Sequence, residues 1–332
     1  AVSMKAESIN GNVINALSDR ALVNVNGVYS VAEAVASVNG TNYESLQTAI
    51  DAAQVGETVV LLKDIELDET VTVGAGKVVT LDLAGHTITG TDNTQANYEV
   101  IDVNRGNLTI TGNGTITLKA VHNNGWNRYS AVIANNQGTL TVNGGRIEHY
   151  GGTNMAYVVD TLTNGGIGDA TTTINGGTIV STYRALRQFA NSSTKENTLV
   201  INGGTISGTN KAVWVQSSNA NANQANLTIS GGVVDGDVYL WAPADGATNG
   251  IVVSMKAECI NGTVVNALVD RALVNVNGVY ALVEAVASVN GTNYATLKEA
   301  FSSIEMMQLL RYHHHTTFFS SRYMLSQIVV PV

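Results

Sequence analysis

The carboxylates are the side chains of this chain with the clearest capacity for chemistry. Paired Asp or Glu side chains could act as general acid and base on a glycosidic bond, and clustered ones could bind Ca²⁺. The candidates are Asp82, Asp102, Asp160, Asp169, Asp235 and Asp237. Only Asp235 and Asp237 are close in sequence, and their Asp-Gly-Asp run is typical of a solvated turn. We find no carboxylate pair within one strand, so the sequence predicts no catalytic residue.

The histidines and the single cysteine predict no metal site and no cofactor. His313, His314 and His315 are consecutive, so on a strand they would point to alternate faces. No spaced carboxylate or cysteine completes a coordination set around them. Cys259 is the only cysteine, which excludes an internal disulfide framework.

Aromatic and cationic side chains recur in four segments that each follow a glycine-rich turn. The segments are MAYVVD (155–160), YRALRQF (183–189), KAVWVQ (211–216) and DVYLWA (237–242). Alternation along the last two would place valines and a leucine inside and Trp214, Tyr239 and Trp241 outside. Tyr157, Arg184 and Arg187 would lie on neighbouring segments, and Trp126 would lie in a separate insertion, HNNGWNRY. Such a strip could stack on sugar rings or contact a partner protein. The alternative is that a neighbouring loop or the next module covers these aromatics, since scattered surface aromatics often have no binding function.

A short internal repeat predicts the elements that carry these residues. Six segments each combine an alternating apolar strand, a turn with glycine and a second strand. They are LDLAGHTI, LTITGNGTI, LTVNGGRI, TTINGGTI, LVINGGTI and LTISGGVV. Taking Leu83, Ile110, Val142, Ile174, Ile201 and Ile229 as equivalent gives steps of 27, 32, 32, 27 and 28 residues. A unit of this size cannot bury its apolar face alone, so neighbours must stack. We predict an all-β fold, a right-handed parallel β-helix with rungs of about 27–32 residues.

The turn within this short repeat predicts a ladder of polar side chains. The residue that follows the first strand is Asn143, Asn175, Asn202 or Ser230 in successive rungs. Stacking would bring these side chains above one another, where amides can hydrogen bond along the axis. The glycines after them supply left-handed backbone for the turn.

A second, longer repeat spans the chain. Residues 2–50 align without gaps with residues 253–301 at an offset of 251 (Met255 minus Met4), with 12 differences in 49 positions. Inside it, residues 45–54 have helical spacing of apolar residues after Ser45, and we expect a short capping helix there.

The domain prediction follows from both repeats. Residues 1–40 form an end segment equivalent to the last rungs of a preceding repeat, and residues 41–278 form the β-helix module. Residues 279–305 start a second repeat, and residues 306–332 are an anomalous tail whose composition fits an out-of-frame reading or a divergent end.

The composition of the chain limits the classes of partner that it is expected to bind. The net charge is −9, from 26 acidic and 17 basic residues, which argues against nucleic acid and anionic membranes. No run approaches the ~18 apolar residues of a membrane span.

The run VNGTNYESLQTAIDAAQVGETVVLLKDI, followed by LDLAGHTITG, resembles β-helix repeats of large surface proteins of gut-dwelling anaerobic bacteria, which are similar to pectate-lyase-like adhesive domains. The resemblance covers roughly residues 25–235 and recurs from 276 to 301, and it implies secretion or display on the bacterial cell surface. We therefore expect a non-catalytic structural or adhesive module of a tandem array. Its partners would be other copies, stacked head to tail, or a glycan or protein of the host or environment. The alternative is a polysaccharide lyase or glycoside hydrolase of the same fold class.

Overall fold

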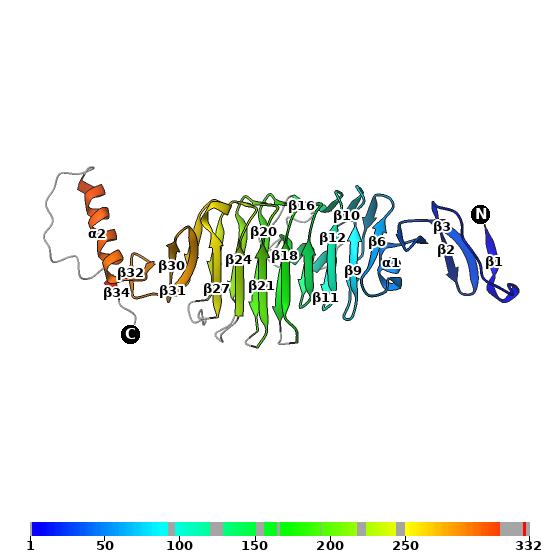
Figure 1. Ribbon diagram of the computed structural model, residues 1–332, viewed down its shortest axis with the longest axis horizontal. Coiled ribbons are helices and arrows are strands. Elements are labelled where there is room, and N and C mark those ends of the chain that lie inside the picture. Colours follow the sequence, from blue (N-terminus) through cyan, green and yellow to red (C-terminus); the bar gives the residue numbers. More distant parts are fainter. Residues whose placement is uncertain are drawn as a thin grey trace.

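The computed structural model describes residues 2–91, 97–119, 129–150, 156–164, 167–192, 194–217, 224–243, 250–312 and 328–329. These residues form an elongated molecule with the two termini at opposite ends (Figure 1). Its middle is a β-solenoid of three stacked parallel sheets, as the short repeat predicted.

The first sheet holds one strand from each rung, and in these strands buried, mainly aliphatic residues alternate with outward, mainly polar ones. Its parallel strands are β6 (Glu57–Leu61), β9 (Val78–Asp82), β12 (Asn107–Thr111), β15 (Thr139–Val142), β18 (Ala170–Ile174), β21 (Glu196–Ile201), β24 (Gln224–Ile229) and β27 (Ile251–Lys256).

The second and third sheets take the next two strands of every rung. The second contains β7 (Ile65–Leu67), β10 (Thr87–Thr91), β13 (Thr115–Lys119), β16 (Arg146–Tyr150), β19 (Thr178–Ser181), β22 (Thr205–Gly208), β25 (Val233–Asp235) and β28 (Ile260–Asn261). The third contains β8 (Val71–Val73), β11 (Asn97–Asn104), β14 (Tyr129–Asn136), β17 (Ala156–Asn164), β20 (Arg184–Asn191), β23 (Lys211–Ser217), β26 (Val238–Trp241) and β29 (Val264–Ala267).

The hydrogen-bond register corrects the predicted alignment of one rung. Leu81, not Leu83, lies opposite Ile110. The cause is the corner between the first and second sheets, which is longer in the early rungs. Leu81 and Ile88 are seven residues apart, whereas their counterparts Val142 and Ile147 are five apart. An alignment that superposes the glycine turns therefore pairs the wrong strand residues in the rung where the turn is longer.

Both ends of the first sheet are covered by antiparallel strands, which protects the solenoid from edge-to-edge pairing. At one end, β4 (Ala36–Val38) pairs with β6 and with β5 (Thr41–Tyr43). At the other end, β31 (Val279–Glu284) pairs with β27 and with β30 (Arg271–Val276).

A short helix closes the core, as predicted for residues 45–54. The helix α1 (Leu46–Ala52) is capped by Ser45, whose hydroxyl accepts a hydrogen bond from the Thr48 amide at 3.1 Å. Its apolar residues Leu46, Ala49 and Ile50 are buried in the same core as the first rungs.

The long sequence repeat appears as a repeated set of elements. The first set is β1 (Ser3–Lys5), a 3-10 turn η1 (Ala6–Ser8), β2 (Arg20–Val25), β3 (Val28–Glu33), β4, β5 and α1. The second set is β27, η2 (Ala257–Cys259), β28, β29, β30, β31, β32 (Ala287–Val289), β33 (Thr292–Tyr294) and α2 (Leu297–Tyr312). Strand β34 (Ile328–Val329) pairs with β32. The helix α2 crosses residue 306, where the tail was predicted to begin. The division into domains and the origin of the tail stay predictions.

Candidate functional site

The outer face of the third sheet carries the aromatic and charged side chains singled out in the sequence. Its strands are in register, so one residue from each rung lies directly beside the next. One such column consists of Asp102, Ala134, Asp160, Arg187, Trp214 and Tyr239.

A buried ion pair lies at the centre of this face. Arg187 donates from Nε to Asp160 Oδ1 at 2.9 Å and makes a second bond from Nη2 to Asp160 Oδ2. Its guanidinium carbon lies 4.2 Å from the ring centroid of Tyr157 and 4.7 Å from that of Phe189. Asp160 and Tyr157 are fully buried, so this part of the face is a packed cluster in which Arg187 is held by its ion pair and by two aromatic rings.

The next cations extend the cluster toward the later rungs. The guanidinium of Arg184 lies 4.4 Å from the ring of Trp214, and its Nη1 donates to the Tyr157 hydroxyl at 3.4 Å. Lys211 Nζ lies 4.7 Å from the ring of Tyr239, and burial lowers the Lys211 pKa, with the charge of Arg184 adding to the effect. Trp214, Lys211 and Tyr239 are half-buried, so this end of the strip reaches solvent.

The two remaining predicted aromatics lie apart from the cluster. Trp241 also points outward on β26, but its register partner is Gln216, one column away from Trp214 and Tyr239. Trp126 falls outside the described residues. The structure thus brings together Tyr157, Arg184, Arg187, Trp214 and Tyr239, and a ligand for them stays a prediction.

Two carboxylates at the other end of the face correct the expectation that no strand carries such a pair. In β11, the consecutive residues Val100 and Ile101 are both fully buried, so the alternation breaks and Glu99 and Asp102 both lie on the outer side. Burial raises the pKa of Glu99 to about 7, with the charges of Asp102 and Asp160 adding to it. Burial also raises the pKa of Asp102 to about 6, and its Oδ1 has no hydrogen-bond donor among the described residues. The signal in the sequence was two adjacent aliphatics between two acids, YEVID, which strict alternation overlooks.

The other carboxylates do not join this group. Asp82 accepts from the Ala84 amide within its own turn, whereas Asp169 accepts from the Glu196 amide and Asp237 from the Thr263 amide of the next rung. Asp235 accepts from the Asn261 side chain on the next rung. Within the described residues, no three His, Cys, Asp or Glu side chains are placed to bind a metal ion.

The polar corner residues form a ladder along the axis. Asn175 donates to Asn143 at 2.9 Å, Asn202 donates to Asn175 at 3.0 Å, and the Ser230 hydroxyl donates to Asn202 at 2.7 Å. Each of these hydrogen bonds joins one rung to the next, so the ladder helps to hold the rungs together.

Comparisons with protein-family models, with curated proteins and with solved structures found no match to this chain. Among the residues that the structure describes, none of the helices combines the length and the apolar character that crossing a bilayer requires.

Proposed function

We propose that this chain is a non-catalytic structural and adhesive module of a tandem array, secreted or displayed on a bacterial cell surface. The observation that carries the proposal is the repeated set of elements on either side of one solenoid. The same hairpin and helix that begin the solenoid at residues 36–52 recur beyond its last rung at residues 287–312. A solenoid bounded by two copies of one connecting unit is the expected building block of a serial array.

The strip of Trp214, Tyr239, Lys211 and Arg184 is the proposed contact face for a glycan or protein. A cation lies over each aromatic ring, and Trp214 and Tyr239 are half-buried, so the rings are restrained and still reach solvent. Partners would include host or environmental glycans and other copies of the module.

A polysaccharide-active enzyme is the second candidate, and one observation favours it. Glu99 and Asp102 lie on the same face as the strip and have pKa values near neutrality, which suits proton transfer to a glycosidic oxygen. The other candidate carboxylates, Asp82, Asp160, Asp169, Asp235 and Asp237, already accept hydrogen bonds from backbone amides, from Asn261 or from Arg187.

One experiment separates these candidates. The full chain is incubated with neutral and acidic polysaccharides, and retention on the polymer and release of shortened or unsaturated products are measured together. We expect retention without products, and we expect Trp214→Leu with Tyr239→Leu to reduce retention while Tyr150→Leu, an exposed tyrosine on the second sheet, leaves it unchanged. Product release that disappears in Glu99→Gln would establish the enzyme instead.

A further inference from the structure

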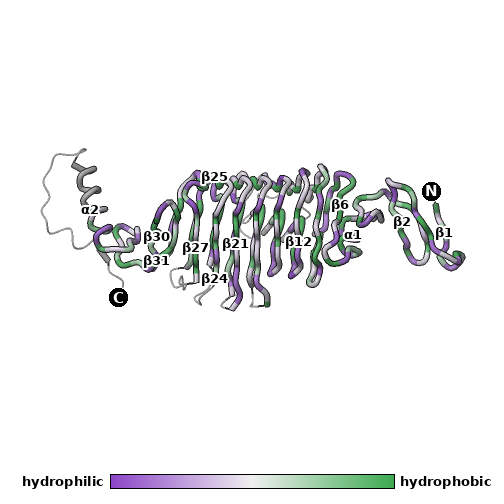
Figure 2. The backbone as a smooth tube through the Cα atoms, viewed as in Figure 1, coloured by the Kyte–Doolittle hydropathy of each residue, from purple (hydrophilic) through white to green (hydrophobic). Residues whose placement is uncertain are grey.

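The outer face of the first sheet differs from the rest of the surface in the side chains that it presents. Hydropathy alternates along its strands, and the inward residues fill the core (Figure 2). The strands β12, β15, β18, β21 and β24, each with the corner that follows it, present three outward residues per rung without a charge or an aromatic ring. We call these residues the threonine face: Asn107, Thr109, Thr111, Thr139, Thr141, Asn143, Thr171, Thr173, Asn175, Thr198, Val200, Asn202, Asn226, Thr228 and Ser230.

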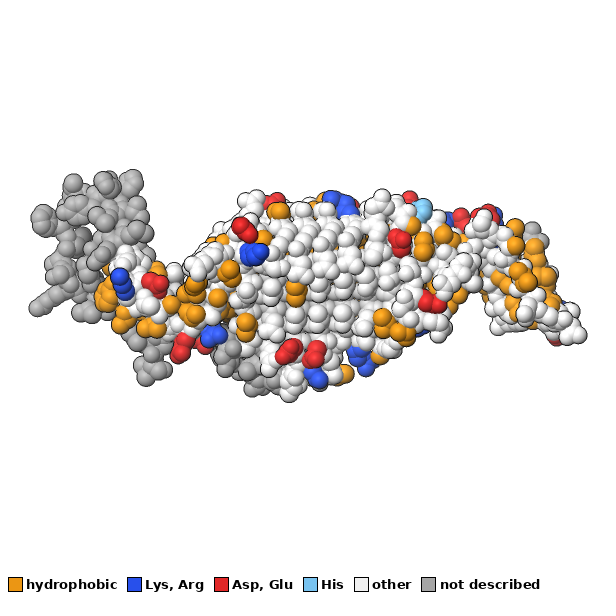
Figure 3. Space-filling model, in the orientation of Figure 1, with side chains coloured by type: hydrophobic (Ala, Val, Ile, Leu, Met, Phe, Trp, Pro, Cys, Tyr) orange, Lys and Arg blue, Asp and Glu red, His pale blue; other side chains and the backbone are white. Residues whose placement is uncertain are grey.

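The side chains of the threonine face are short and held in place. Most of them are threonines, whose branching at Cβ restricts χ1 and so fixes the positions of the hydroxyl and the methyl group. Asn143, Asn175 and Asn202 are held by the ladder of hydrogen bonds between rungs. Figure 3 shows this flank of the middle of the molecule almost without hydrophobic or charged colours. The face is therefore a rigid surface of hydroxyl, amide and methyl groups.

The threonine face is periodic in two directions. Thr141 lies opposite Thr173 on the next strand, and Thr139 lies opposite Thr171. The same two columns continue over all five strands. Neighbours within a column are about 4.8 Å apart, and the two columns are about 6.7 Å apart. Rungs of 27 and of 32 residues share this register, because their difference in length falls after the second sheet.

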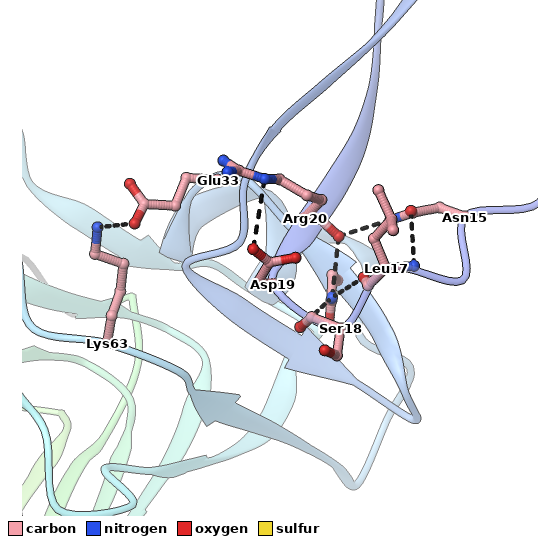
Figure 4. Close-up of polar contacts among 8 residues, drawn as sticks. Asn15, Leu17, Ser18, Asp19, Arg20, Glu33 and Lys63 are labelled. Carbon is pink, nitrogen blue, oxygen red and sulfur yellow. Dashed lines mark hydrogen bonds and ion pairs between the residues drawn. The ribbon is translucent and has the colours of Figure 1, made fainter. Parts of the chain in front are cut away.

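Charged side chains lie on other surfaces of the molecule. On the second sheet Arg146 pairs with Glu148, and the third sheet carries the buried ion pair described above. Where the solenoid begins, Lys63 pairs with Glu33 at 2.8 Å (Figure 4). Along β21 the charged residue is Glu196, at the first position of the strand and so at the margin of the face. A chain with a net charge of −9 thus has one broad flank without charge.

The composition and the size of the threonine face argue against the usual classes of partner. Sugar rings stack on aromatic side chains, and the face has none. A second protein needs large apolar or aromatic anchors and about 800 Å² per partner. Five rungs of three outward residues cover only about 24 by 17 Å, or about 400 Å². The groups that the face does offer are hydroxyls and amides, which donate to water and accept from it.

We propose that the threonine face binds ice. Ice presents flat, uncharged layers of oxygen atoms that repeat in two directions at distances similar to the spacings of the threonine columns. One hydrogen bond to ice gains little over one to liquid water, so attachment needs many aligned groups on a rigid surface, and the strand register supplies them. The methyl groups restrict the orientations of adjacent water, which favours an ordered layer. This activity goes beyond the proposed function, whose contact face lies on the third sheet.

Thermal hysteresis and crystal shape test the proposal on the full chain. We expect the wild-type chain to depress the freezing point below the melting point and to shape growing ice crystals. Thr141→Lys with Thr173→Lys places two long, hydrated side chains at the centre of the face, and the hysteresis should be lost. Thr178→Lys with Thr205→Lys places the same neighbouring pair on the outer face of the second sheet and should retain it. Equal hysteresis in the two variants would overturn the proposal.

A second measurement needs no variant, in case the lysines prevent folding. Ice is grown slowly in a solution of the wild-type chain, and the chain is quantified in the ice and in the liquid. We expect enrichment in the ice, and exclusion from it would overturn the proposal. Wild-type dimers that Thr141→Lys with Thr173→Lys disperses in sedimentation would overturn it too, because a second copy would then occupy the face. Trp214→Leu with Tyr239→Leu, which tests the third-sheet strip, should leave ice binding unchanged, so failure of one proposal is distinguishable from failure of the other.

Discussion

The ionisable side chains on the outer face of the third sheet lie in two kinds of environment. Arg187 and Asp160 form a buried ion pair, whereas burial raises the pKa values of Glu99 and Asp102, so these two carboxyl groups resist ionisation. The difference comes from position along one sheet, since all four residues lie on its outer face.

The raised pKa of Glu99 predicts that stability falls as the pH rises. A glutamate with a folded-state pKa of about 7 and an ordinary value of 4.5 binds its proton more tightly in the folded chain. Its contribution is therefore complete below pH 4.5 and is lost as the pH rises through 7. We expect Glu99→Gln to raise the Tm relative to wild type at pH 8 and to change it little near pH 4.5. Glu196→Gln, on an exposed glutamate of β21, serves as control, and an equal gain at both pH values would contradict the assignment.

The Arg187–Asp160 pair predicts a large loss when only one partner is removed. Arg187→Met leaves the fully buried Asp160 carboxylate without its cation, at a cost of about 3–5 kcal/mol in the free energy of unfolding. Arg187→Met with Asp160→Leu should recover most of that loss, as urea unfolding would show. Arg146→Met breaks the more exposed pair with Glu148 and should cost only about 1 kcal/mol or less. Similar losses at Arg187 and Arg146 would show that burial does not govern the pair.

At the scale of elements, the sequence predicted the strands, the corner ladder and the capping helix because each depends on local pattern. Alternation identified Val213 and Val215 as inward and Trp214 as outward, and the structure agrees. It missed Glu99 because two consecutive inward residues, Val100 and Ile101, shift the faces of β11, and only packing reveals such a shift. It misplaced Leu83 because corner length varies between rungs, and the burial of Tyr157 on an outer face could not be read from alternation at all.

In the stacked corner turns, glycine is required both by its positive φ and by the close approach of the preceding rung. Gly204 and Gly278 have φ of +78° and +82°, so alanine at either is strained by about 1–2 kcal/mol. A Cβ on Gly204 would also lie 2.8 Å from the Gly177 carbonyl oxygen of the preceding rung, whereas a Cβ on Gly278 meets nothing within 4 Å. Gly204→Ala should therefore destabilise the chain by a further ~1–3 kcal/mol relative to Gly278→Ala in thermal or urea unfolding. Equal losses would mean that the rungs separate easily enough to admit the methyl group.

At the scale of the whole molecule, two segments of near-identical sequence, residues 2–10 and 253–261, lie at different positions along the stack. Among the described strands, β1 in residues 2–10 pairs with β3 alone, whereas β27 in residues 253–261 pairs with both β24 and β31. Propensity is the same in both copies, so any difference in protection measures what a neighbouring rung contributes.

Hydrogen exchange on the native chain measures that contribution directly. Peptides that contain Ser8 or Cys259 have different masses, so the two copies can be followed in one sample. We expect amides of residues 253–261 to exchange roughly tenfold or more slowly than those of residues 2–10, because an opening free energy larger by about 1.4 kcal/mol gives that factor. The β2–β3 and β30–β31 hairpins, which have matching antiparallel pairing in both copies, serve as the internal control and should differ much less. Equal protection of the two rung segments would mean that the local hairpin alone stabilises them, and stacking on β24–β26 would then contribute little to the end of the solenoid.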